Sequence, residues 1–60
     1  MIQIQHLDVG TRLKLKSGAV VEVADNPRDG TWLVARPVGP DGVAAEATEL
    51  VNADEVMELT

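Results

Sequence analysis

Apolar and polar positions alternate most clearly at the start of the chain. Over residues 11–16 apolar and basic residues alternate, so Leu13 and Leu15 point to one face of an extended strand. Residues 19–23 repeat the alternation, with Val21 and Val23 on one face. The intervening Lys16-Ser17-Gly18 has the composition of a tight turn. This pattern predicts a β-hairpin.

The alternation also predicts how the two strands pair, because directly opposed residues of an antiparallel pair share one face. A two-residue loop would place Leu13 opposite Glu22 and mix apolar with charged side chains. A three-residue loop places Leu13 opposite Val21 and Arg12 opposite Glu22. We therefore expect the three-residue loop, with Gly18 at the positive φ that such loops require.

Shorter signals predict the elements on either side of this hairpin. Ile2 and Ile4 alternate with glutamines, which suits a short strand with one buried face. Residues 25–30 combine Asn, Pro and Gly at turn positions, and the final Gly30 is expected at positive φ. Residues 31–38 are apolar on both faces and contain a proline near their end. This composition is typical of an inner strand whose pairing stops near the proline.

Residues 43–51 are ambiguous between a strand and a helix. Their composition favours a helix, and four apolar positions could form a helical stripe. The segment nevertheless follows the turn at residues 39–42 directly and lacks a good N-terminal cap, so we favour a strand. Asn52 and Glu55 have the spacing of a capped helical turn, and residues 56–59 predict a short last strand.

These elements indicate an all-β protein. Short strands separated by turn signals at roughly ten-residue spacing are typical of a small barrel or sandwich. The 60 residues suffice for a single domain, in which a barrel shields its own edges. Because only one residue is aromatic, the core must be aliphatic. We expect residues 1–60 to form a five-stranded barrel with one helical turn before the last strand.

The same residues resemble SH3-like small barrels, in particular KOW-type modules and short bacterial proteins of unassigned role. The resemblance rests on VGTRLKLKSG (residues 9–18), VVEV (residues 20–23), DGTWLV (residues 29–34) and NADEV (residues 52–56). It covers most of the chain in outline and implies the barrel fold. KOW-type barrels commonly bind RNA or other proteins. Recognition of proline-rich peptides needs an aromatic groove, which a chain with Trp32 as its only aromatic residue cannot assemble.

Charge is distributed unevenly along the chain. The net charge is −5, but residues 1–36 carry +1 and residues 37–60 carry −6 with no basic residue. In the predicted hairpin, Arg12, Lys14 and Lys16 project in a row from one face, a geometry that could follow a phosphate backbone. We favour the simpler interpretation of a solvated face, in which Arg12 and Glu22 form a surface ion pair worth under about 1 kcal/mol.

Trp32 and Arg36 form a second candidate binding surface, because both lie on one face of the predicted strand. For Trp32 we favour burial in the core, where its loss would cost about 3–5 kcal/mol. An exposed Trp32 would instead anchor a protein partner together with Arg36, since both residue types are enriched in binding hot spots. The acidic segment 37–60 could contact a basic protein or the basic row of a second copy.

Composition limits the chemistry that the chain can perform. The absence of cysteine excludes disulfides, thiolate zinc sites and thiol nucleophiles, and His6 alone cannot build a multi-histidine metal site. We expect His6 at the surface. We also expect a cytoplasmic protein without membrane contact, because neither a signal peptide nor an apolar run of about 20 residues is present. The sequence thus predicts a non-enzymatic module without a cofactor that binds a protein partner or itself. An RNA- or DNA-binding module is the alternative.

Overall fold

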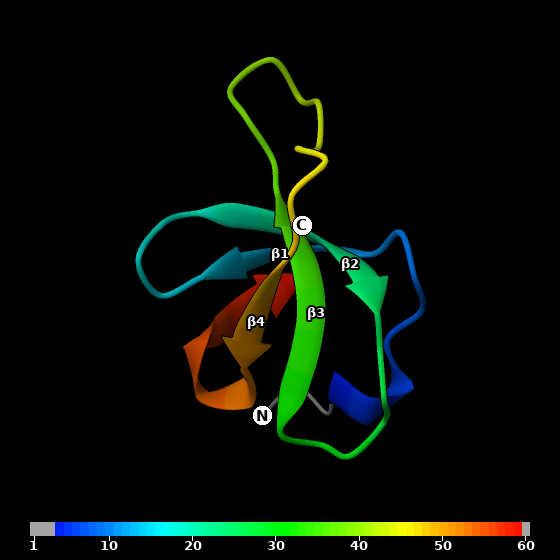
Figure 1. The fold of residues 1–60 in the computed structure, drawn as a ribbon. Coiled ribbons are helices and arrows are strands. Elements are labelled where there is room, and N and C mark those ends of the chain that lie inside the picture. The colour runs from blue at the N-terminus through cyan, green and yellow to red at the C-terminus, as the bar shows by residue number, and fades with distance from the viewer. Residues whose placement is uncertain (1–3, 60) are drawn as a thin grey trace.

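Five short strands form one antiparallel sheet in the computed structural model, which describes residues 4–59 (Figure 1). In chain order the elements are η1 Ile4–His6, β1 Arg12–Leu15, β2 Val20–Asp25, β3 Trp32–Pro37, β4 Glu49–Asn52, η2 Ala53–Glu55 and β5 Val56–Leu59. The strand order across the sheet is β4-β3-β2-β1-β5, so β4 and β5 are its edges. The short 3-10 turn η1 precedes β1, and the second 3-10 turn, η2, connects β4 to β5. The all-β prediction is confirmed.

The β1–β2 hairpin has the predicted register. Leu13 lies opposite Val21, and Arg12 lies opposite Glu22. The backbone N–H of Leu15 donates to the carbonyl of Ala19 at 2.8 Å, which closes a loop of three residues. Gly18 within this loop has φ +93°, as expected. The alternation of apolar and polar residues was therefore sufficient to determine both the register and the turn.

Replacing Gly18 by alanine is expected to lower the free energy of unfolding by about 1–2 kcal/mol, the cost of holding an L-residue in left-handed backbone. Strain is the only cost, because a Cβ on Gly18 would meet nothing within 4 Å. Urea unfolding of the variant measures it. Gly18→Asn is the control, since asparagine tolerates left-handed backbone and should lose less. Equal losses in the two variants would contradict this explanation.

The short turn η2 connects the two edge strands and bonds to both sides of the sheet. Asn52 caps it, because the Asn52 side-chain oxygen accepts from the N–H of Asp54 at 2.9 Å. The N–H of Ala53 donates to the carbonyl of Thr31 at 2.7 Å, just before β3. The N–H of Lys16 donates to the carbonyl of Glu55 at 2.8 Å, just after β1. The predicted helical turn is confirmed, and its bonds attach the connection between the two edge strands to the residues next to β3 and β1.

A closed barrel is not confirmed. In the described part of the chain, β4 pairs only with β3 and β5 pairs only with β1. The chain crosses from one edge to the other through η2 instead of through a ladder between β4 and β5. Among residues 4–59 the sheet is therefore open, and each of its two edge strands pairs on one side only.

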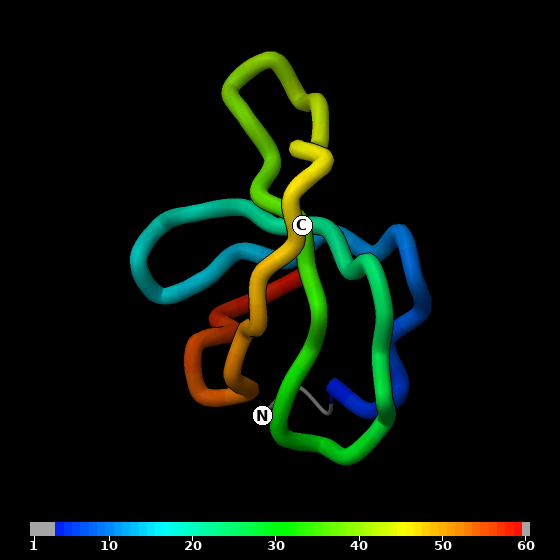
Figure 2. Tube along the Cα trace, in the orientation of Figure 1, coloured from blue at the N-terminus to red at the C-terminus, as the bar shows by residue number. Residues whose placement is uncertain are grey.

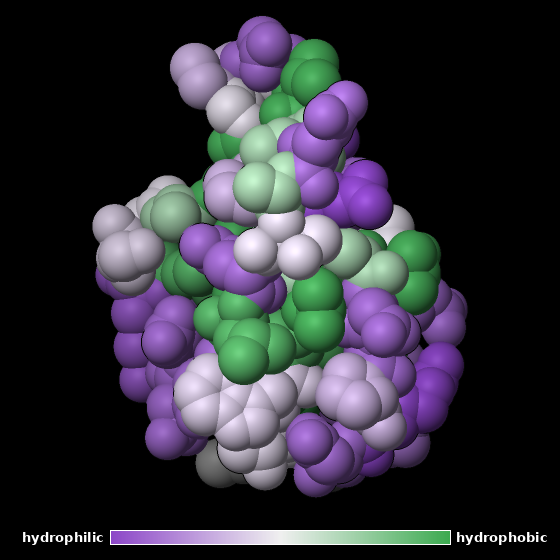
Figure 3. Space-filling view, in the orientation of Figure 1, coloured by the Kyte–Doolittle hydropathy of each residue, from purple (hydrophilic) through white to green (hydrophobic). Residues whose placement is uncertain are grey.

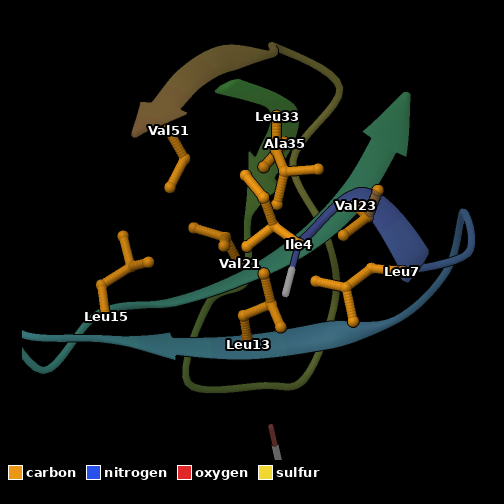
Figure 4. Close-up of a cluster of buried hydrophobic side chains, with 9 residues drawn as sticks. All are labelled: Ile4, Leu7, Leu13, Leu15, Val21, Val23, Leu33, Ala35 and Val51. Atoms are coloured by element: carbon orange, nitrogen blue, oxygen red, sulfur yellow. The ribbon is translucent and has the colours of Figure 1, made fainter. Parts of the chain in front are cut away.

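The concave side of the sheet holds an aliphatic core, as predicted. Nine buried residues of the described chain form it, and they come from η1, the segment after η1 and strands β1 to β4 (Figure 4). Figure 4 shows Ile4 in the middle of this cluster, between the side chains of β1 and β2 and those of β3. The nine are Ile4, Leu7, Leu13, Leu15, Val21, Val23, Leu33, Ala35 and Val51.

The predicted strand around Ile2 and Ile4 is wrong at Ile4, which belongs to η1; Ile2 lies outside the described residues. A long-range contact explains the turn. The side-chain amide of Asn26 donates to the carbonyls of Ile4 at 2.8 Å and Leu7 at 2.9 Å. The guanidinium of Arg28 donates to a third carbonyl, that of Gln5, at 3.0 Å. Side chains from the β2–β3 loop thus satisfy backbone groups that a strand would have paired within the sheet.

Residues 43–51 contain a strand, as favoured, but only at their end. β4 begins at Glu49, and a single bridge between Val38 and Ala44 precedes it. The loop between β3 and β4 extends away from the sheet (Figure 2). Its tip is closed by the bond from the N–H of Gly42 to the carbonyl of Gly39 at 2.9 Å. None of residues 43–51 is helical, so the turn at residues 39–42 outweighed the helix-forming composition.

Candidate functional site

The convex face of the sheet carries the residues that were predicted to bind a partner. Strand alternation directs Leu33 and Ala35 into the core, so Trp32, Val34 and Arg36 lie on the opposite, outer face. Trp32 is 41% exposed, which corrects the expectation that it is buried. The sequence could not show which face of this strand the core would cover, because both faces are largely apolar.

Trp32 joins two other apolar side chains in a surface that we call the β3–β4 patch: Trp32, Val34 and Leu50. Val34 lies directly opposite Leu50 across the ladder, and Leu50 is 65% exposed. Figure 3 shows apolar side chains gathered over β3 and β4. Contiguous exposed apolar groups often mark interaction sites. Sequence reasoning missed Leu50. In the structure Val51 is buried, so strand alternation places its neighbour Leu50 on the outer face.

Asp29 holds the backbone that carries Trp32. Its carboxylate oxygen Oδ1 accepts from the N–H of Thr31 at 2.8 Å and from the N–H of Trp32 at 3.1 Å. These two backbone bonds favour the charged form, so they lower the pKa of the Asp29 carboxyl below its ordinary value. The start of β3 is therefore fixed by an ionised side chain.

Acidification is expected to loosen this start of β3. Because the folded-state pKa of Asp29 is lowered, its contribution to stability is present above the ordinary carboxyl pKa and is lost as the pH falls through the lowered value, below about pH 4. Amide NMR resonances of Thr31 and Trp32 should shift with the Asp29 titration. In Asp29→Asn, which keeps a neutral acceptor oxygen, that shift should vanish. The same acid-induced shift in the variant would contradict the assignment.

The predicted basic row is interrupted by acidic residues. Arg12 and Lys14 lie on the outer face of β1, but Lys16 lies beyond its end. The Arg12 Nε atom is 3.4 Å from a carboxylate oxygen of Glu22, as the predicted pair requires. Glu58 of β5 lies directly opposite Lys14. The row is thus a mixed-charge surface, and the contribution of Glu58 could not be foreseen without the β1–β5 pairing.

Arg36 connects the two candidate surfaces. It lies opposite Glu22, so Arg12, Glu22 and Arg36 form a row across β1, β2 and β3 with alternating charge. Arg36 is also on the same strand face as Trp32, as predicted. The side chain of Glu22 lies between two cations, whereas Arg36 borders the β3–β4 patch. The structure therefore brings Arg36 and Trp32 onto one surface and separates both from Lys16.

Comparison with protein-family models, with curated proteins and with solved structures gave no match. Among residues 4–59, no group of three or more metal-ligating side chains is placed to hold a metal ion. Within the same residues, neither short helical turn has the length or apolar character to cross a membrane. His6 lies exposed in η1, at the surface as expected.

Proposed function

We propose that this protein is a small non-enzymatic SH3-like module that binds another protein chain through the β3–β4 patch. The observation that carries the proposal is the exposure of Trp32 beside Leu50 and Val34. The SH3-like part is supported by the order of the five strands, and by the single helical turn between β4 and β5. The cytoplasm remains the compartment that we propose.

The patch contains one residue type that is enriched in binding hot spots, Trp32, and borders another, Arg36. Tryptophan and arginine are the residues whose truncation most often weakens protein interfaces, and Trp32 and Arg36 share the outer face of β3. Leu50 extends the apolar area onto the edge strand. A partner that covers the patch gains apolar burial, at about 25 cal/mol per Å² before the costs of association.

Affinity capture from a cell lysate tests this proposal, with three immobilised forms of the protein. We expect one or more proteins to be retained by the wild type and by Lys16→Ser, which alters an exposed residue away from the patch. Leu50→Ser, an exposed substitution within the patch, should lose them. Retained proteins are then purified and titrated, with Trp32 emission reporting burial of the patch. No specific retention, or equal retention by Leu50→Ser, would contradict the proposal.

Binding to RNA or DNA is the less supported alternative. The residues proposed to bind it are Arg12, Lys14, Lys16 and Arg36. Glu22 lies between Arg12 and Arg36, however, and Glu58 lies opposite Lys14. A titration with short RNA at low salt separates the alternatives. We expect no amide shifts at the four basic residues. Shifts that weaken steeply as salt rises would instead support nucleic-acid binding.

A further inference from the structure

Within residues 4–59, no strand pairs with the backbone groups on the outer edge of β4. In an antiparallel ladder, opposed residues alternate between pairs that exchange hydrogen bonds and pairs that do not. The N–H of Ala53 bonds to Thr31, so in the same register Val51 and Glu49 direct their backbone groups toward β3. Leu50 consequently directs its N–H and C=O away from β3. Among the described strands, none pairs with this side of β4.

The two edges of the sheet are protected to different degrees. Natural edge strands are usually blunted by lysines, prolines or bulges. The β1–β5 ladder has a register shift between Lys14 and Leu15, which makes β5 an irregular edge although Val56–Leu59 contains neither lysine nor proline. The β3–β4 ladder is regular, and Glu49–Asn52 contains neither lysine nor proline. The β4 edge is therefore the one suited to accept another strand.

Charge identifies the kind of strand that this edge accepts. The residues around β4 include Glu46, Glu49, Asp54 and Glu55, and no basic residue occurs from residue 37 to residue 60. Pairing of β4 with β4 of a second copy would bring two such segments together, and their like charges would repel. A basic strand would be attracted. Its apolar side chains would lie on the outer face beside Leu50, and its basic side chains on the other face beside Glu49.

We propose that the β4 edge binds an extended segment of a partner protein in which apolar and basic residues alternate. The segment adds a sixth strand to the sheet and covers the β3–β4 patch. This inference rests on the proposed function and specifies its partner. Backbone bonds to Leu50 supply the pairing, contacts with Trp32 and Leu50 supply the apolar burial, and Glu49 supplies the preference for basic residues.

Synthetic peptides test the inference, with Trp32 emission and amide NMR as readouts. A short peptide of alternating valine and lysine should bind, shift the amide of Leu50 and slow its hydrogen exchange. The same peptide with alternate backbone nitrogens methylated keeps its side chains but loses the N–H donors. It should bind at least about tenfold more weakly. A valine–glutamate peptide should not bind, and Glu49→Lys should weaken the valine–lysine peptide.

Four outcomes would overturn the inference. Equal binding of the methylated and unmethylated peptides would show that backbone pairing is not used, and equal binding of the glutamate peptide would remove the charge argument. If no peptide binds, but proteins are still retained by the wild type and lost by Leu50→Ser, the proposed function stands and the inferred kind of partner is wrong. If light scattering shows a dimer that Leu50→Ser dissolves, a second copy occupies the edge instead.

Discussion

Replacing Leu33 by alanine is expected to unfold a large fraction of the protein. Leu33 is 0% exposed within the core, and leucine-to-alanine changes at such sites cost about 2–5 kcal/mol. At typical values per residue, a chain of 60 residues has a total stability of only about 3–9 kcal/mol. The loss caused by the substitution is thus comparable to the total free energy of unfolding. Circular dichroism during urea unfolding measures the loss.

Leu50→Ala is the matched control, since it deletes the same atoms from an exposed position of the neighbouring strand. We expect it to change the free energy of unfolding by less than about 0.5 kcal/mol. Similar losses for Leu33→Ala and Leu50→Ala would contradict the assignment of inner and outer faces. That result would also remove the basis of the β3–β4 patch.

Replacing Asn26 by aspartate is expected to have the second large effect, about 2–4 kcal/mol of lost stability. The substitution preserves size but removes the amide that donates to the carbonyls of Ile4 and Leu7. Each half-buried acceptor left without a partner costs about 1–3 kcal/mol, and the new carboxylate would repel both. Ile4 belongs to the core, so the loss should extend beyond the loop. Urea unfolding measures the total, and faster hydrogen exchange at Leu7 would locate it.

Asn52→Asp provides the comparison, because within residues 4–59 the Asn52 side chain forms a hydrogen bond only as an acceptor. Its side-chain oxygen accepts from the N–H of Asp54, and aspartate is an equally good cap. We expect the free energy of unfolding of this variant to lie within about 0.5 kcal/mol of that of the wild type. A large effect of Asn52→Asp, or a small effect of Asn26→Asp, would contradict the hydrogen-bond roles assigned to the two side chains.

The sequence predicted those parts of the fold that depend on local alternation and turn chemistry. The register of Leu13 against Val21 followed from keeping apolar residues on one face, and Gly18 followed from that register. The cap at Asn52 was equally local. Because neighbouring residues alone determine these features, a single sequence was sufficient to predict them.

Features that depend on distant contacts could not be predicted. Ile4 alternates like a strand residue, yet the Asn26 side chain, far along the chain, satisfies the carbonyl that a strand would have paired. The exposure of Trp32 depends on which face of β3 meets the core, and the run around it is apolar on both sides. Leu50 acquires its place in the candidate site only through its pairing with Val34. The acidic interruption of the basic row likewise requires Glu58 to lie beside Lys14.

The pairing of β1 with β5 has a consequence for the order of folding during synthesis. This ladder joins Leu13 to Leu59, so β1 can pair on one side as soon as β2 has been made but must wait for β5 on the other. Contacts between such distant residues form slowly, because a long loop must close first. Until then β1 is a temporary edge of the nascent chain. Lys14 lies on this edge and Lys16 lies just beyond its end, and lysines at such an edge discourage association between unfinished chains until β5 has been made.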